Sequence, residues 1–163
     1  MLIEIAHELN EYDIDGLECD YVALEWYEAA KKVLHKKSRG GLDVGIRNLG
    51  GHPLRDGDVL WRDDRRALLA ELLPCDCLAL KPRTMPEMAR AAYELGNRHA
   101  PLFAEGEELL TPYDAPLFNA LEKCGFTVTR KTAKLKTPLG GYEHEQGHEH
   151  RHRHGHGHAH RHS

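Results

Sequence analysis

The first 74 residues alternate short apolar stretches with turn-forming residues. Residues 42–46 read Leu-Asp-Val-Gly-Ile, an alternation typical of a strand with one buried face. Turns are predicted at Gly50-Gly51, at residues 55–58 (Arg-Asp-Gly-Asp) and at Asp63-Asp64. We therefore predict a small β domain whose strands cover residues 1–5, 21–26, 42–46, 59–61 and 67–73.

Residues 26–37 fit two patterns. The segment Glu-Ala-Ala-Lys-Lys at 28–32 consists of good helix formers, so propensity alone predicts a helix here. Val33 and Leu34, next to basic residues, suit a strand almost as well.

The pattern changes after Pro74, which we take as a domain boundary. Residues 75–81 are predicted to form a strand, followed by a capping box at Thr84 and Glu87. The helix that starts there is predicted to end at Leu95, with Gly96 in the left-handed conformation. Its apolar face is predicted to contain Met85, Met88, Ala92 and Leu95.

A second helix is predicted after two strands at 101–104 and 109–111. Asp114 is its N-cap and Gly125 its end. Its apolar residues recur at i, i+3, i+4 and i+7, namely Leu117, Ala120, Leu121 and Cys124. With a last strand at 126–129, the order β-α-β-β-α-β predicts a ferredoxin-like domain.

The predicted fold class is thus α+β, in three parts. Residues 1–74 form a β domain, 75–142 a ferredoxin-like domain, and 143–163 a disordered tail without large apolar residues. The net charge of −4 belongs to the body, because the tail's three Glu and three Arg cancel. An acidic body argues against a nucleic-acid or anionic-membrane surface.

The sequence shows no pattern typical of a secretion signal or a membrane span. The chain starts without a basic region followed by an apolar run, and no stretch approaches the roughly 20 apolar residues of a membrane span. Four scattered cysteines do not make a disulfide scaffold. We therefore expect a cytoplasmic protein with reduced thiols.

The tail is the clearest chemical signal. It holds nine of the 13 histidines, and from His148 onward they occupy every second position. Alternate residues of an extended chain share a face, so neighbouring imidazoles can bind one ion, and imidazole suits Ni, Cu and Zn. A purification tag is the alternative, but tags are usually uninterrupted. The candidate ligands are His144, His148, His150, His152, His154, His156, His158, His160 and His162.

One tail segment also matches the zinc-protease pattern H-E-x-x-H, at His144-Glu145-Gln146-Gly147-His148. That mechanism needs a helix, with Glu145 as general base. Gly147 inside the pattern and Gly140-Gly141 before it disfavour a helix, so we interpret the match as accidental. Neither Ser38 nor Ser163 lies in a nucleophile context, and we expect no enzyme activity.

His99 follows the first predicted helix, between Gly96 and Pro101. A histidine there is most often a surface residue or one that interacts with the helix carbonyls, although a stiff turn would also pre-organise it as a ligand. Cys75 and Cys77 could offer two thiolates from one strand face, but such residues are more often small hydrophobes packed under a helix. We apply the same core interpretation to Cys124.

At Glu94-Leu95-Gly96-Asn97-Arg98-His99 the sequence resembles the UreE family of urease accessory proteins, which are nickel metallochaperones. The likeness continues over residues 54–60 and 81–88, at Tyr113-Asp114 and Gly125-Phe126, and in the histidine-rich tail.

The resemblance implies a homodimer in which His99 from both subunits binds one Ni²⁺, with the tail histidines as auxiliary ligands; Zn²⁺ or Cu²⁺ could bind in vitro. It implies delivery to a urease apoprotein assembly complex that contains an accessory GTPase. It also implies that residues 27–37 form a turn leading into a strand.

Some relatives carry histidines on both sides of the aspartate that matches Asp114. Here Tyr113 and Ala115 stand there, so we expect that additional site to be lost and Asp114 to act as a helix cap.

Three hypotheses follow, and we favour nickel delivery. The others are passive Ni or Zn storage without a delivery partner, and a zinc hydrolase using His144, Glu145 and His148. An RNA-binding role is weaker, because no aromatic pair lies on the predicted strands.

Overall fold

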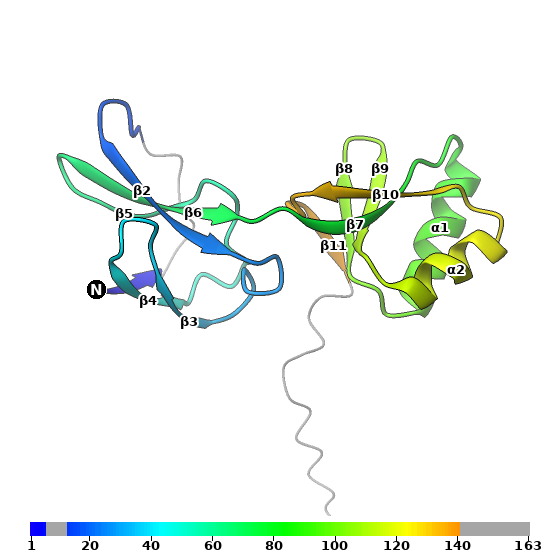
Figure 1. Cartoon of the computed structure of the whole chain (residues 1–163), viewed down its shortest axis with the longest axis horizontal. Helices are drawn as coiled ribbons and strands as arrows, with labels where there is room; N and C mark the ends of the chain where they lie inside the picture. The colour runs from blue at the N-terminus through cyan, green and yellow to red at the C-terminus, as the bar shows by residue number, and fades with distance from the viewer. Residues whose placement is uncertain (6–12, 141–163) are drawn as a thin grey trace, which may run out of the picture.

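The computed structural model describes residues 1–5 and 13–140, which form two units (Figure 1). The first unit contains strands only, and the second contains both helices. Among the described residues, no helix is long and apolar enough to cross a membrane.

The N-terminal unit consists of two three-stranded sheets, ordered β1-β4-β3 and β2-β6-β5. Burial alternates along β1 and β4, and the inward residues of both sheets share one core, which includes Val22, Leu24, Val44 and Ile46. The predicted β domain is therefore present. Its strands are β1 (Leu2–Ile5), β2 (Glu18–Leu24), β3 (Val33–Lys37), β4 (Asp43–Asn48), β5 (Val59–Arg62) and β6 (Arg66–Leu72).

The helix that propensity predicts over residues 26–37 is wrong. Residues 25–31 form turns, with Glu28 N–H donating to Glu25 O at 2.9 Å and Lys31 N–H to Glu28 O at 3.0 Å. β3 then pairs antiparallel with β4, and Leu34 lies opposite Ile46 in the core. Pairing with the following strand, β4, outweighs the local helix preference of the Glu-Ala-Ala-Lys-Lys segment. The turn and strand implied by the family resemblance are confirmed.

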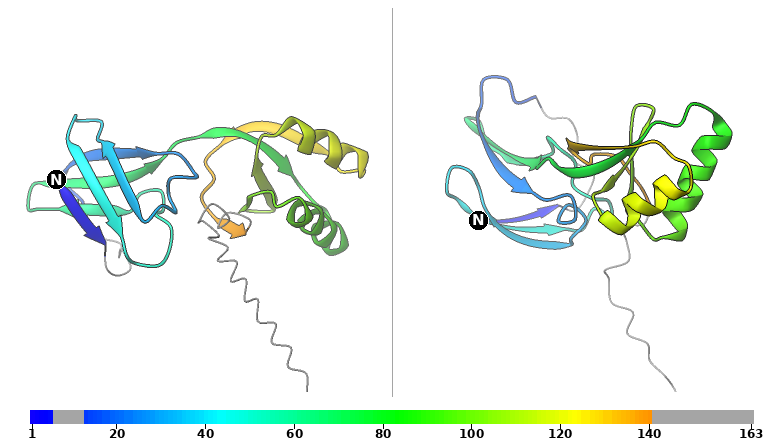
Figure 2. Two further views of the ribbon diagram at one scale, coloured as in Figure 1. Left: turned by 90° about the horizontal axis from the view of Figure 1, so that it is seen from below. Right: turned by 45° about the vertical axis from the view of Figure 1, so that its right-hand side comes forward.

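The second unit is a five-stranded sheet, ordered β10-β7-β9-β8-β11 with every neighbouring pair antiparallel. Both helices pack on one face of it, against Leu78 and Leu80 (Figure 2). Cys77 and Ala79 alternate with these residues and lie in a separate cluster on the opposite face. The elements are β7 (Cys75–Leu80), α1 (Met85–Asn97), β8 (Leu102–Glu105), β9 (Glu108–Pro112), α2 (Ala115–Lys123), β10 (Val128–Ala133) and β11 (Pro138–Gly140).

Two strands near the C-terminal end differ from the prediction. The last predicted strand, 126–129, starts two residues too early, since Phe126 and Thr127 lie between the turn after α2 and the start of β10. β11 was not predicted, because Pro138-Leu139-Gly140 has no alternation, and it extends the sheet beside β8.

Candidate metal centre

His99 lies directly beyond α1, and the way this helix ends differs from the prediction. The helix continues through Gly96 to Asn97, with Arg98 as C-cap. Gly96 does not take a positive φ; His99 does, at 53°, the only non-glycine residue in the described part to do so. The left-handed residue therefore comes three positions later than predicted, because the buried Leu95 lies inside the last turn and not at its end.

Two hydrogen bonds hold this turn. His99 N–H donates to Gly96 O at 3.0 Å, and Ala100 N–H donates to Leu95 O at 3.1 Å. Ala100 and Leu95 are both buried in one cluster. These bonds and this apolar contact define a Schellman motif, with His99 at its left-handed C′ position. The backbone of His99 is fixed, while its side chain is exposed.

The end of α2 provides an internal comparison. Gly125 N–H donates to Glu122 O at 2.9 Å and Phe126 N–H to Leu121 O at 3.2 Å, which is the same motif. There the C′ residue is a glycine with φ of 85°. A left-handed residue with a side chain costs roughly 1 kcal/mol more than glycine. Histidine at the end of α1 is thus not the residue that folding alone favours, which makes His99 a candidate functional residue.

The surface of α1 next to His99 is apolar and exposed. Met85 was predicted to lie in the core, but it is 85% exposed, because it lies to one side of the helix face that carries the buried Ala91 and Leu95. We define the α1 strip as Met85, Ala89, Tyr93 and Gly96, exposed residues at i, i+4, i+8 and i+11. Tyr93 is 67% exposed, and nothing lies within 4 Å of where a Cβ on Gly96 would be. The strip was not predicted from the sequence, although the spacing of its residues was a signal.

Cys75 and Cys77 lie on one strand face with their sulfurs 3.4 Å apart. Cys77 is fully buried in the cluster opposite the helices. Burial, together with the neighbouring Cys77 thiol, raises the pKa of Cys75 to about 12, and burial raises the pKa of Cys77 as well. Both therefore stay protonated at neutral pH, which agrees with small apolar core residues and not with thiolate ligands. The predicted packing under a helix is wrong, because their strand face is the one opposite α1 and α2.

Asp114 is a helix cap, as predicted. Its Oδ1 accepts from Leu117 N–H at 2.7 Å at the start of α2. The ring of the neighbouring Tyr113 faces the guanidinium of Arg130, 3.8 Å from the ring centroid. Arg130 also donates from Nε to both oxygens of Asp76 at 3.0 Å. The surroundings of Asp114 therefore present a cation and an aromatic ring.

Within residues 1–5 and 13–140, no three or more His, Cys, Asp or Glu side chains are grouped so that they could hold an ion. His35 is exposed on β3, and His52 lies with Nδ1 3.2 Å from Pro53 O, both far along the chain from His99. The nine tail histidines, from His144 to His162, and the His144–His148 zinc pattern fall outside the described residues. An ion at His99 would therefore need further donors from outside the described residues or from a second chain.

Two family models match the chain. The UreE urease accessory protein C-terminal domain matches residues 75–162, and the UreE N-terminal domain matches residues 2–71.

Curated relatives named urease accessory protein UreE match over almost the whole length. The protein from Acetivibrio thermocellus is 49% identical over 149 residues, which are 91% of this chain and 97% of that protein. The one from Flavobacterium johnsoniae is 34% identical over 89% of this chain and 88% of its own length. The one from Lysinibacillus sphaericus is 31% identical over 88% of this chain and its full length. With both domain models matched in order and close relatives of the same length, the chain belongs to the UreE family of urease accessory proteins.

Proposed function

We propose that this chain is a nickel metallochaperone, which binds Ni²⁺ and delivers it to apo-urease while the urease active site is assembled. Family membership supports an accessory role rather than an enzymatic one. The observation that carries the proposal is His99, an exposed imidazole on a fixed turn at a position where the equivalent turn of α2 has glycine. Imidazole is a good ligand for Ni²⁺, although affinity alone does not exclude Zn²⁺ or Cu²⁺.

The tight site is shared between two chains in this proposal. A two-fold axis beside His99 would bring one imidazole from each subunit to a single ion. The α1 strip supports this arrangement, because it is an exposed apolar surface next to His99, and a second copy of the same strip would cover it. Gly96 leaves room for close approach of the second chain.

The three-part organisation is part of the proposal. Residues 1–74 would bind partner proteins, namely the urease apoprotein assembly complex and its accessory GTPase. Residues 75–142 would form the ferredoxin-like metal and dimerisation domain, an interpretation supported by the antiparallel sheet order β10-β7-β9-β8. Residues 143–163 would supply auxiliary imidazoles from His144 onward. The proposed location is the cytoplasm.

The alternative is a passive Ni or Zn store without a delivery partner. The separate N-terminal β unit favours delivery, since a store needs only ligands. The two functions are separated by affinity capture of apo-urease and the other accessory proteins with the full-length chain. Metallochaperone function predicts capture that Ni²⁺ modulates, whereas absence of capture under every metal condition would support storage.

Tyr93→Glu tests the shared site. A charge in the centre of the α1 strip should shift the protein from dimer to monomer in sedimentation and reduce the affinity of the tight Ni²⁺ site in the same samples. Asn119→Glu, which introduces the same charge at an exposed position of α2, is the matched control. A monomeric variant that keeps the tight site would contradict the sharing of one ion by two chains.

A further inference from the structure

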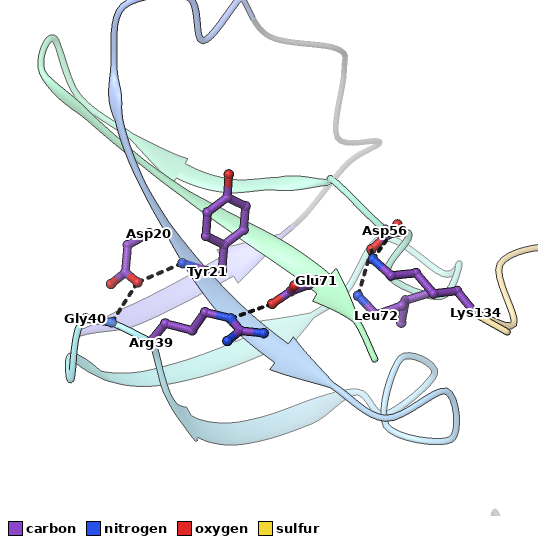
Figure 3. Close-up of polar contacts among 8 residues, drawn as sticks. All are labelled: Asp20, Tyr21, Arg39, Gly40, Asp56, Glu71, Leu72 and Lys134. Atoms are coloured by element: carbon purple, nitrogen blue, oxygen red, sulfur yellow. Dashed lines mark hydrogen bonds and ion pairs between the residues drawn. The ribbon is translucent and has the colours of Figure 1, made fainter. Parts of the chain in front are cut away.

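Asp56 is fixed on the N-terminal unit by backbone hydrogen bonds. It lies in the tight turn at 55–58, where Gly57 has φ of 89° and Gly57 N–H donates to Ala70 O at 2.8 Å. Asp56 Oδ1 accepts from Leu72 N–H at 2.8 Å, at the end of β6 (Figure 3). The carboxylate therefore moves only together with β6.

Two lysines of the second unit contact this carboxylate. Lys134 Nζ lies 3.0 and 3.1 Å from its two oxygens, and Lys136 Nζ lies 3.1 Å from Oδ2. Both come from the segment between β10 and β11, and alternate positions put them on one side of it. Leu135 between them is only 2% exposed and packs in the core of the second unit. The lysines are thus anchored by a core residue of their own unit.

An apolar contact accompanies the ionic one. Trp26, in the turn region after β2, meets Phe103 of β8 edge-on, with ring centroids 5.9 Å apart and planes at 82°. Trp26 packs on the same cluster that contains Leu135. The two units are therefore joined at two places, by side chains from two different turns of the N-terminal unit, besides the chain itself at residues 73–74.

We propose that Asp56 with Lys134 and Lys136 forms a latch, which holds the N-terminal β unit in one orientation against the second unit. The negative charge of the Asp56 carboxylate attracts both ammonium groups and offsets the repulsion between the two lysines. The side chain of Asp56 is 17% exposed, so the cluster is less screened than a surface ion pair. Leu72 N–H adds a backbone bond that defines the position of the carboxylate. If Asp56 is neutralised or its charge is screened, the contact of Trp26 with Phe103 remains to hold the orientation of the two units. The latch stands independently of the nickel proposal.

The test uses ¹⁵N relaxation of the full-length protein, which reports how fast each unit tumbles. In the wild type at low salt, both units should show the same apparent rotational correlation time. Asp56→Asn keeps an acceptor for Leu72 N–H but removes the charge, so the two times should separate and become shorter. Asp58→Asn is the matched control: Asp58 lies in the same turn, and its Oδ2 accepts from Arg55 N–H at 2.7 Å. This control should tumble as the wild type does.

A second route does not depend on Asp56→Asn folding. Replacing both lysines, Lys134→Met and Lys136→Met, should reproduce the separation of the two correlation times. Raising the salt to about 1 M, where the screening length falls to roughly 3 Å, should do so in the unaltered protein. Equal correlation times for the two units in the double-lysine variant and at high salt would overturn the latch, as would separation in Asp58→Asn.

Discussion

His99 is a residue whose conformation and chemistry have different requirements. Its left-handed backbone favours glycine, as the matching turn with Gly125 illustrates. The proposed binding of Ni²⁺, in contrast, requires an imidazole at this position. His99→Gly should therefore raise the free energy of unfolding of the metal-free protein by about 1 kcal/mol and abolish the tight Ni²⁺ site. His99→Ala should lose the site without the gain in stability. Urea unfolding of metal-free protein and calorimetric Ni²⁺ titration give the two readouts.

Destabilisation by His99→Gly would mean that the histidine side chain contributes to the fold. The unusual φ would then no longer support a role in metal binding. Gly125→Ala provides the opposite control at the end of α2, where introducing a side chain should cost about 1 kcal/mol.

At the level of elements, alternation and capping residues were enough to predict most of the strands and both helices. They worked where local interactions determine the structure. Thr84 and Asp114 are examples, because their side chains accept hydrogen bonds from backbone N–H groups in the first turns of α1 and α2. They failed where pairing with another strand determines the structure. Residues 33–37 are a strand because β4 lies beside them, and β11 exists because β8 offers an edge. The end of α1 was misplaced for a related reason: packing of Leu95 and Ala100 outweighs the preference of Gly96.

Asp114 tests the local part of that explanation. Asp114→Ala removes the bond to Leu117 N–H and should lower the free energy of unfolding by about 1 kcal/mol. Asn119→Ala on the exposed side of α2 should change it by no more than about 0.5 kcal/mol. Chemical denaturation compares the two variants. Equal effects would indicate that Asp114 does not act as a cap.

At the level of the whole molecule, Asp56 links stability to pH. Burial alone would raise the pKa of Asp56, but hydrogen bonds from Lys134, Leu72 N–H and Lys136 outweigh it and lower the pKa below its usual value. The unfolded chain then takes up the proton first as the pH falls. The contribution of Asp56 is therefore complete above about pH 4 and is lost below it.

This linkage predicts that Asp56→Asn lowers stability at pH 7 and narrows the gap to wild type as the pH approaches 3. Urea unfolding across this range measures the gap. Asp58→Asn is the control, because the side-chain contacts of the described residues pair Lys134 and Lys136 with Asp56 and not with Asp58. A gap that stays constant down to pH 3 would contradict the lowered pKa of Asp56.

The proposed metal site could not be worked out from composition and spacing alone, for a physical reason. Among the described residues, no group of three or more His, Cys, Asp or Glu side chains could hold an ion, so the proposed site at His99 takes its remaining donors from a second chain or from residues 143–163. The pattern within a single sequence holds no information on how two copies meet. The family resemblance supplied that expectation, and the exposed α1 strip supports it.

The most direct test is calorimetric Ni²⁺ titration of tail-deleted protein, lacking residues 143–163, beside the full-length chain. We predict that deletion lowers the total number of ions bound but leaves one tight ion for every two chains. His99→Gly in the tail-deleted protein should then remove that ion, while the protein stays folded. One tight ion per single chain, or a tight site that survives His99→Gly, would contradict a shared site at His99.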